Sequence, residues 1–153
     1  MQTAWRLTKT RYLATAWDGE GARRSGGRWN SVGIAVVYTS ATLSLTLLET
    51  LVHITSSVLP AYTAIPIDFE DSLVEVLATA ALPADWRSDP APGSTRAIGD
   101  AWYLAARSPV LKVPSVVVPG ESNYVLNPRH PGFAQVHIGA PMPFPFDPPL
   151  PLP

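Results

Sequence analysis

Cysteine is absent from the 153 residues of the chain, and this absence removes several kinds of chemistry at once. Without thiols there are no disulfides, no thiolate zinc sites and no cysteine nucleophiles. Long apolar runs are also missing: none approaches the ~20 residues that a membrane helix needs, and residues 1–11 hold no apolar core of signal-peptide length. These absences predict a soluble protein of the cytoplasm with no membrane association.

Neither positive nor negative side chains are in large excess, because 11 basic residues stand beside 12 acidic ones. Binding to nucleic acid normally takes a basic face, so no direct nucleic-acid partner is predicted. A small anionic ligand remains compatible, since it needs only one or two well-placed arginines. With 46% apolar and 15% charged residues, the chain is expected to fold as one domain around a real core.

Proline, by contrast, is abundant at 17 residues, which favours short strands, edges and loops over a helical bundle. Two helices are expected. One is largely buried, begins with Ser40 as its N-cap and contains TLLETLVH; the other is amphipathic, runs from Ser94 or Thr95 to about Arg107 and buries Trp102. Residues 19–33 are expected to form a loop. The predicted strands cover residues 4–7, 34–39, 61–67, 73–77, 110–113, 115–118, 123–126 and 133–138. Strands that outnumber helices without regular alternation predict a compact α+β domain.

A glycine-rich segment, GGRWN, carries the first candidate site residue. Gly26 and Gly27 allow the backbone to approach a ligand closely, and the guanidinium of Arg28 offers a planar fork of donors suited to phosphate. The segment matches neither a P-loop nor a dinucleotide-binding GxGxxG motif, so a solvated surface arginine is the alternative. Trp29 beside it either lines a pocket or packs in the core.

Glu49 stands out as a carboxylate inside an apolar helix. Burying an unpaired charge is costly, so Glu49 is expected to have either a partner, such as Arg28, or a chemical task. His53 lies four residues later on the same helical face. A metal site there would need His130 or His137 as a third ligand, and two ligands without a recognised third are weak evidence. No metal is predicted.

Ser115 follows Pro114 in the segment KVPSVVVPG. A serine hydrolase would need a histidine base and an oriented acid, and the chain contains no GxSxG elbow. Ser115 is therefore expected to act as a hydrogen-bonding group at the end of a strand and not as a nucleophile. A serine satisfied by its own backbone is the alternative.

The order of three segments along the chain resembles the RES domain, a family named for arginine, glutamate and serine. The segments are GGRWNSVGIAVVYTS, LTLLETLVH and VPSVVVPGESNYVLNPRHP, and the opening AWRL fits too. The resemblance predicts a RES domain over residues 1–147 and a proline-rich tail over residues 148–153. It maps the three named residues onto Arg28, Glu49 and Ser115.

The same resemblance suggests further site residues. Tyr38, in VVYTS, matches a tyrosine associated with the family's site. Asn30, Asn123 and Asn127 fall in matching segments and are expected, with Trp29, to support the ligand pocket.

The resemblance implies a fold similar to ADP-ribosyltransferases of the diphtheria-toxin type, with NAD⁺ as substrate and no metal. It implies a bacterial toxin that depletes NAD⁺ by hydrolysis or phosphorolysis of the nicotinamide–ribose bond. Transfer of ADP-ribose to a specific protein is the alternative. The expected partner is an Xre-type antitoxin that blocks the site, and a homo-oligomer within that complex is compatible with the family.

A mechanism follows from these assignments. Arg28 is expected to bind a phosphate of NAD⁺ and Tyr38 to pack against the nicotinamide or its ribose. Glu49 is expected to stabilise the positive charge that grows on the ribose as nicotinamide leaves. Ser115 would orient either that ribose or Glu49 itself.

The chain departs from the family pattern at its end. The family often closes with a basic residue just after an FDP-like strand, whereas FDPPLPLP places Pro149 there. This puts in doubt any role for a terminal arginine. The ending also contains a PxxP-like pattern, so a non-enzymatic interaction module is a further alternative. An extended tail packed on the edge of the sheet is favoured over it.

Overall fold

The computed structural model describes residues 1–54 and 59–146, so the predicted tail at residues 148–153 lies outside the described part. The strands are β1 (Gln2–Lys9), β2 (Val37–Ser40), β3 (Tyr62–Phe69), β4 (Val74–Val76), β5 (Val110–Pro114), β6 (Ser122–Leu126), β7 (His137–Ile138) and β8 (Met142–Phe144). The α-helices are α1 (Glu20–Ser25), α2 (Leu43–Leu51) and α3 (Gly93–Leu104), and the 3₁₀ helices are η1 (Thr10–Thr15), η2 (Asp71–Leu73), η3 (Thr79–Ala81) and η4 (Pro131–Gln135). This arrangement confirms the α+β class.

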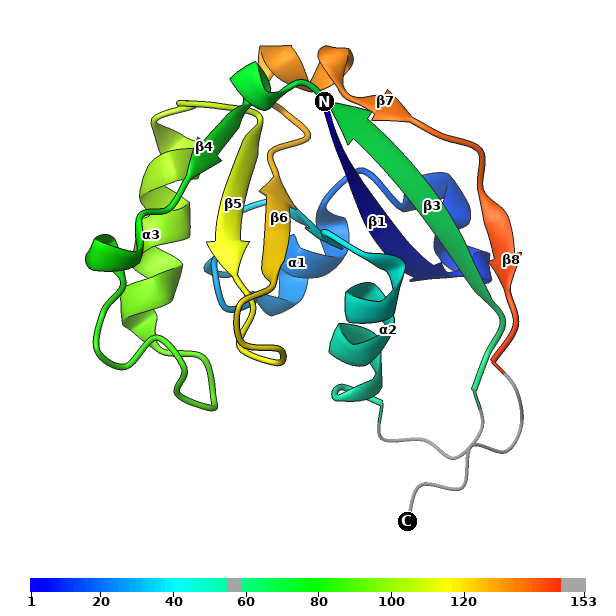
Figure 1. Cartoon of the computed structure of the whole chain (residues 1–153), viewed down its shortest axis with the longest axis horizontal. Coiled ribbons are helices and arrows are strands. Elements are labelled where there is room, and N and C mark those ends of the chain that lie inside the picture. Colours follow the sequence, from blue (N-terminus) through cyan, green and yellow to red (C-terminus); the bar gives the residue numbers. More distant parts are fainter. Residues whose placement is uncertain (55–58, 147–153) are drawn as a thin grey trace.

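The strands form one mixed sheet in the order β4-β5-β6-β2-β1-β3-β7, with β8 also paired to β3 (Figure 1). The sheet is nearly divided in the middle. β1 pairs with β3 along its whole length, and β2 pairs with β6 from Val37 to Ser40, but β1 and β2 meet only at the pair Trp5–Ser40. Beyond that pair the two halves of the sheet separate.

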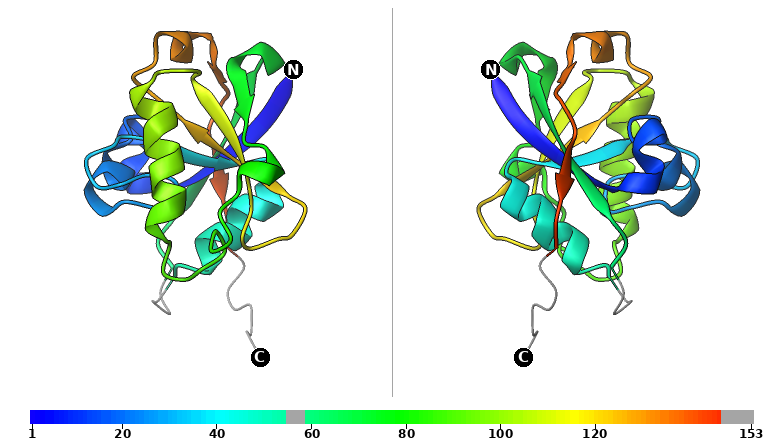
Figure 2. Two further views of the ribbon diagram at one scale, coloured as in Figure 1. Left: turned by 90° about the vertical axis from the view of Figure 1, so that its left-hand side faces the viewer. Right: turned by 90° about the vertical axis from the view of Figure 1, so that its right-hand side faces the viewer.

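Helix α3 covers one face of the half formed by β5, β6 and β2, which Figure 2 shows from the side. Trp102 of α3 is completely buried there, as predicted, against Leu111 and Val125. Two neighbouring residues at the start of β2 point to opposite faces of the sheet: Val36, just before the strand, joins this cluster, whereas Val37 joins a second core with Ile67 and Phe69. The second core joins the two halves of the divided sheet, because it combines Ala4 of β1 and Ile67 of β3 with Leu126 of β6.

Helix α2 differs from its prediction in two ways. Its N-cap is Thr42, whose side chain accepts a hydrogen bond from the backbone N–H of Leu45, whereas the predicted cap Ser40 ends β2. The helix is also not largely buried. It packs on the sheet through Leu45 and Thr46, and Leu48 is 43% exposed because its side chain lies on the outer face.

Three loop and strand predictions are wrong for identifiable reasons. Residues 115–118 are not a strand, because the Ser115 Oγ accepts hydrogen bonds from the N–H groups of Val117 and Val118 and turns the chain. Residues 19–33 contain the helix α1, whose Glu20–Arg23 ion pair supports it. Residues 133–138 are mainly the 3₁₀ helix η4 followed by the short strand β7.

Within the described ranges, no helix combines the length and the hydropathy that a membrane span requires.

Candidate functional site

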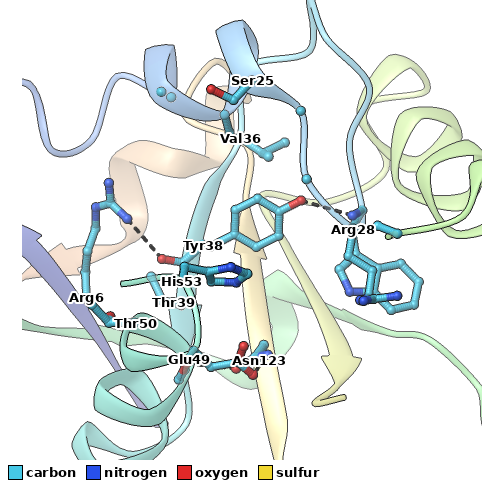
Figure 3. A pocket seen from close by; sticks show the side chains of 18 of the residues that line it. Arg6, Ser25, Arg28, Val36, Tyr38, Thr39, Glu49, Thr50, His53 and Asn123 are labelled. Carbon is cyan, nitrogen blue, oxygen red and sulfur yellow. Dashed lines mark hydrogen bonds between the residues drawn. The ribbon is translucent and has the colours of Figure 1, made fainter. Parts of the chain in front are cut away.

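A cleft opens where β1 and β2 separate. It has a volume of ≈ 1710 Å³ and includes side chains from β1, from the GGRWN segment, from β2 and from α2. Ligand pockets for drug-sized molecules span roughly 300–1,000 Å³, so this cleft has room for a ligand as long as a dinucleotide. Figure 3 shows the polar side chains that face it; those used below are Arg6, Arg28, Tyr38, Glu49, His53 and Asn123.

Glu49 is half-buried on α2 and its carboxylate is held by two other side chains. Its Oε1 accepts a hydrogen bond from the Ser115 Oγ at 2.8 Å and another from the Asn123 Nδ2 at 2.8 Å. The partner suggested from the sequence, Arg28, does not pair with it. One carboxylate oxygen is therefore fixed by neutral donors, and no ion pair of Glu49 occurs among the described residues.

Ser115 is 1% exposed and does not line the cleft. Its hydroxyl donates to Glu49 and accepts from the N–H groups of Val117 and Val118, at 3.1 and 3.0 Å. The hydroxyl is fully used by these contacts. Of the two tasks considered for Ser115, the geometry favours orienting Glu49 over touching a ribose.

Tyr38 of β2 lies in the centre of the cleft in Figure 3. Its hydroxyl donates to the Asn30 Oδ1 at 2.7 Å and accepts from the Trp29 N–H at 3.0 Å. Burial raises the pKa of the Tyr38 hydroxyl above its ordinary 10.0, so the group stays protonated as a donor. Gly27 contributes by having no side chain, because a Cβ there would lie 2.7 Å from the Tyr38 hydroxyl.

Asn30 is completely buried and serves the backbone of its own segment. Its Nδ2 donates to the carbonyls of Ala22 and Ile34, at 2.9 and 3.0 Å, while its Oδ1 holds Tyr38. These contacts favour a role for Asn30 in positioning Tyr38 rather than in touching a ligand. The two alternatives for Trp29 both apply, because Trp29 lines the cleft and also packs in the core, where it is 2% exposed.

Arg28 is half-buried and reaches across to the segment before α3. Its Nη1 donates to the carbonyls of Trp86 and Ser88, at 2.8 and 2.9 Å. These two bonds fix the plane of the guanidinium, and no hydrogen bond from Nε or Nη2 to another described residue is recorded. The free edge of the fork is the part suited to a phosphate.

Helix α3 holds the arginine-bearing segment from behind, a feature not anticipated from the sequence. A Cβ on Gly99 would lie 1.6 Å from the Trp29 carbonyl oxygen, so only glycine permits this contact. The next residue, Asp100, accepts from the Ser31 N–H at 2.9 Å and from the Ser31 Oγ at 2.5 Å. A glycine inside a regular amphipathic helix lowers the stability of the helix by about 1 kcal/mol relative to alanine. The position of Gly99 was therefore the sequence feature that could have indicated a close contact.

Arg6 of β1 also lines the cleft, as do Arg24 and Arg96, and was not predicted to do so. Its Nε donates to the Ala16 carbonyl at 2.7 Å and its Nη1 to the Tyr38 carbonyl at 3.2 Å. Burial lowers the pKa of Arg6 to about 10, partly offset by the charge of Asp18, so the side chain remains cationic at neutral pH.

The structure does not bring every predicted residue to the cleft. Asn127 is buried elsewhere, where its Oδ1 accepts from the Arg129 N–H. His53 lines the cleft and is exposed, but His130 and His137 do not line it. His130 instead bonds the Gly132 N–H and the Ala106 carbonyl. No group of three histidine, aspartate or glutamate side chains placed to hold a metal occurs among the described residues.

Comparison with known proteins finds that the model of the RES domain family matches residues 3–147. A protein of Yersinia enterocolitica named Toxin Res is 45% identical over 148 residues, covering 95% of this chain and 97% of that protein. A protein of a Sphingobium species named Prs ADP-ribosylating toxin is 40% identical over 133 residues and 83% of each chain. A chain in the crystal structure of the M. tuberculosis MbcT–MbcA toxin–antitoxin complex has the same fold, with a TM-score of 0.74, 22% identity and coverage of 94% of this chain and 84% of that one.

Proposed function

The chain belongs to the RES domain family of toxins, and from this premise we propose that it cleaves the bond between nicotinamide and ribose in NAD⁺. The observation that carries the proposal is the Glu49 carboxylate, which faces a dinucleotide-sized cleft and is held through one oxygen by Ser115 and Asn123. A fixed carboxylate is the group that glycoside-cleaving enzymes use to stabilise an oxocarbenium-like ribose.

The proposed reaction begins with heterolysis of the ribose C1′–nitrogen bond. The bonding electrons leave with nicotinamide, which becomes neutral, and positive charge develops on the ribose. The Glu49 Oε2 stabilises that charge, while the Ser115 and Asn123 donors keep the carboxylate from rotating. An incoming water or phosphate oxygen then bonds to C1′, and water gives up one proton to solvent.

Arg28 and Tyr38 are the proposed binding residues. The free edge of the Arg28 guanidinium binds a phosphate, because its Nη1 is already fixed by two carbonyls and holds the plane in place. The Tyr38 ring packs against the nicotinamide or its ribose, with its hydroxyl locked by Asn30. Asn123 holds the Glu49 carboxylate in place. The proposed scheme assigns no step to a metal.

A second candidate function is favoured by the name of the Sphingobium relative, an ADP-ribosylating toxin. In this alternative a protein nucleophile, not water or phosphate, takes the ribose C1′. Both candidates use the same cleft and the same Glu49. The proposed cellular setting is also shared: a cytoplasmic toxin whose cleft is covered by an antitoxin. The structural neighbour supports an antitoxin partner, because it comes from a toxin–antitoxin complex.

The experiment that tests the function is incubation of purified chain with NAD⁺, with and without phosphate, and identification of products by mass. Free nicotinamide with ADP-ribose would indicate hydrolysis, and ADP-ribose that carries a phosphate on the same ribose carbon would indicate phosphorolysis. Labelled NAD⁺ added to a bacterial extract tests the alternative function, because transfer of ADP-ribose to a specific target would place the label on one protein. A folded sample that releases no nicotinamide under any of these conditions would rule out both candidates.

A further inference from the structure

Ser40 lies at the point where the two halves of the sheet meet. It pairs with Trp5 of β1 on one side and with Asn123 of β6 on the other. Its side chain is almost completely buried and lies on the same face of β2 as the Tyr38 ring, because residues two apart in a strand share a face. Pairing on both sides therefore holds the Ser40 hydroxyl at a fixed place in the wall of the cleft.

The Ser40 hydroxyl is linked to Glu49 through the side chain of Asn123. The Ser40 Oγ donates to the Asn123 Oδ1 at 2.8 Å, and the Asn123 Nδ2 donates to the Glu49 Oε1 at 2.8 Å. Figure 3 shows Asn123 beside Glu49. Among the residues that the structure describes, no other hydrogen bond of the Ser40 Oγ is recorded. Ser40 thus reaches the carboxylate through one intermediate side chain.

The chemistry of the three groups sets the direction of this chain of hydrogen bonds. An ionised carboxylate only accepts, so the amide of Asn123 must present its NH₂ group to Glu49 and its oxygen to Ser40. The single proton of the Ser40 hydroxyl is then used by the Asn123 Oδ1. The χ2 torsion of asparagine is only broadly restrained by its own rotamer preferences. The contact with Ser40 is therefore what fixes the plane of the amide.

A carboxylate that stabilises a developing charge must be in place before the reaction begins. The Ser115 hydroxyl also donates to the Glu49 Oε1, but a carboxylate held by one donor can still turn about that contact. Resting on the proposed function, we propose that Ser40 is a positioning residue for the cleavage of NAD⁺ and that it acts on Glu49 only through Asn123. Because the charge on the ribose exists only in the transition state, loss of Ser40 should lower kcat and leave KM nearly unchanged.

The test is a double-mutant cycle of Ser40→Ala and Asn123→Ala, with kcat and KM for NAD⁺ measured for the wild type and the three variants. In the wild-type background, Ser40→Ala is expected to lower kcat about 3- to 10-fold, the factor that corresponds to one neutral hydrogen bond, and to change KM less than about 2-fold. In the Asn123→Ala background the hydroxyl has lost its partner, so Ser40→Ala is expected to change kcat by less than about 2-fold.

The matched control is Ser108→Ala, which makes the same substitution outside the cleft. The Ser108 Oγ donates to the Val110 carbonyl and accepts from the Trp102 Nε1, both at 2.8 Å, so its removal should lower the free energy of unfolding without reaching Glu49. Turnover by this variant is expected to equal that of the wild type. Should Ser40→Ala fail to fold, Ser40→Cys takes its place in the cycle, since a thiol is only a weak donor.

Three results would overturn the inference. If the folded Ser40 variant keeps the wild-type kcat, the hydroxyl does not position Glu49. If it lowers kcat by the same factor in both backgrounds, Ser40 acts independently of Asn123. If it raises KM while kcat stays unchanged, Ser40 contacts the ligand and is not a positioning residue.

The same measurements separate this inference from the proposed function. A wild type that consumes NAD⁺, together with any of these three results, would overturn the inference alone. A folded wild type that releases no nicotinamide would overturn the proposed function and the inference with it.

Discussion

The carboxylate end and the arginine end of the cleft are held in place by different means. Glu49 is positioned by side chains that come from separate parts of the chain, Ser115 after β5 and Asn123 on β6. The segment around Arg28 is positioned mainly by contacts to main chain, and α3 approaches its backbone so closely that Gly99 can carry no side chain. The side chains at the carboxylate end hold one oxygen atom, the Glu49 Oε1, whereas the main-chain contacts at the arginine end hold a whole segment. Substitutions at the two ends should therefore fail in different ways.

The largest effect is expected at the carboxylate end, from Glu49→Gln. The amide oxygen can still accept both hydrogen bonds that Oε1 accepts now, so the fold should be kept while the charge is lost. Removing one well-placed electrostatic group typically lowers the rate by about 10²–10³. The check is NAD⁺ turnover beside circular dichroism and a melting curve. Turnover at the wild-type rate would contradict the proposed role of Glu49.

At the arginine end, Gly99→Ala is expected to lower stability first. Its Cβ would overlap the Trp29 carbonyl oxygen at 1.6 Å, so α3 and the Arg28 segment must move apart. Overpacking of this kind costs about 1–3 kcal/mol, which exceeds the ~1 kcal/mol gained in helix propensity. Denaturant unfolding measures the expected decrease in the free energy of unfolding.

The matched control is Gly93→Ala, in the first turn of the same helix. The nearest atom to a Cβ there is the Arg96 Nη2 at 3.9 Å, so the substitution should be neutral or stabilising by up to about 1 kcal/mol. Equal unfolding free energies for the two variants would show that α3 does not clamp the segment.

Tyr38→Phe sits between the two ends and should have a smaller effect. The ring remains, but the Asn30 Oδ1 and the Trp29 N–H lose their shared partner. Buried groups left unpaired cost about 1–3 kcal/mol in total stability. Turnover should fall far less than in Glu49→Gln, because the hydroxyl faces Asn30. A loss of rate as large as that of Glu49→Gln would mean that the hydroxyl takes part in the chemistry.

The smallest effect concerns alkaline pH. Burial raises the pKa of Tyr38 above 10.0, so the folded state favours the neutral hydroxyl. Stability from this group is complete below the unfolded pKa of about 10 and is lost as pH rises above it. Unfolding free energies between pH 9 and 11 should therefore decline less steeply in Tyr38→Phe than in the wild type. Identical slopes would argue against burial of the hydroxyl.

The sequence predicted the candidate site better than it predicted the contacts that build it. Arg28, Tyr38, Glu49 and Asn123 all line one cleft, and the order of the motifs grouped them before any contact was known. Their roles toward a ligand stay predictions. Arg6 and Gly99 escaped notice because their importance depends on contacts between β1 and β2 and between α3 and Trp29. Such contacts between distant segments leave no local pattern in the chain.

Errors in the fold had a similar origin. The apolar residues 115–118 carry strand propensity, but the hydroxyl of Ser115 captures two N–H groups and prevents an extended conformation. Ser40 and Thr42 are both residues suited to capping a helix, and pairing of Ser40 with Asn123 in the sheet decided which one caps α2. Tertiary pairing thus chose between local options that the sequence left equal. The α+β class is confirmed, while its likeness to diphtheria-toxin-type enzymes remains a prediction.

The division between β1 and β2 also gives the molecule strand edges in its interior. An unpaired edge normally invites another chain to add a strand, which is a route to aggregation. Here the two edges face each other across the cleft, and Arg6 occupies the Tyr38 carbonyl that an added strand would need. A cationic side chain, of the kind that protects exposed edges elsewhere, thereby takes a main-chain carbonyl that a polypeptide strand would otherwise bind.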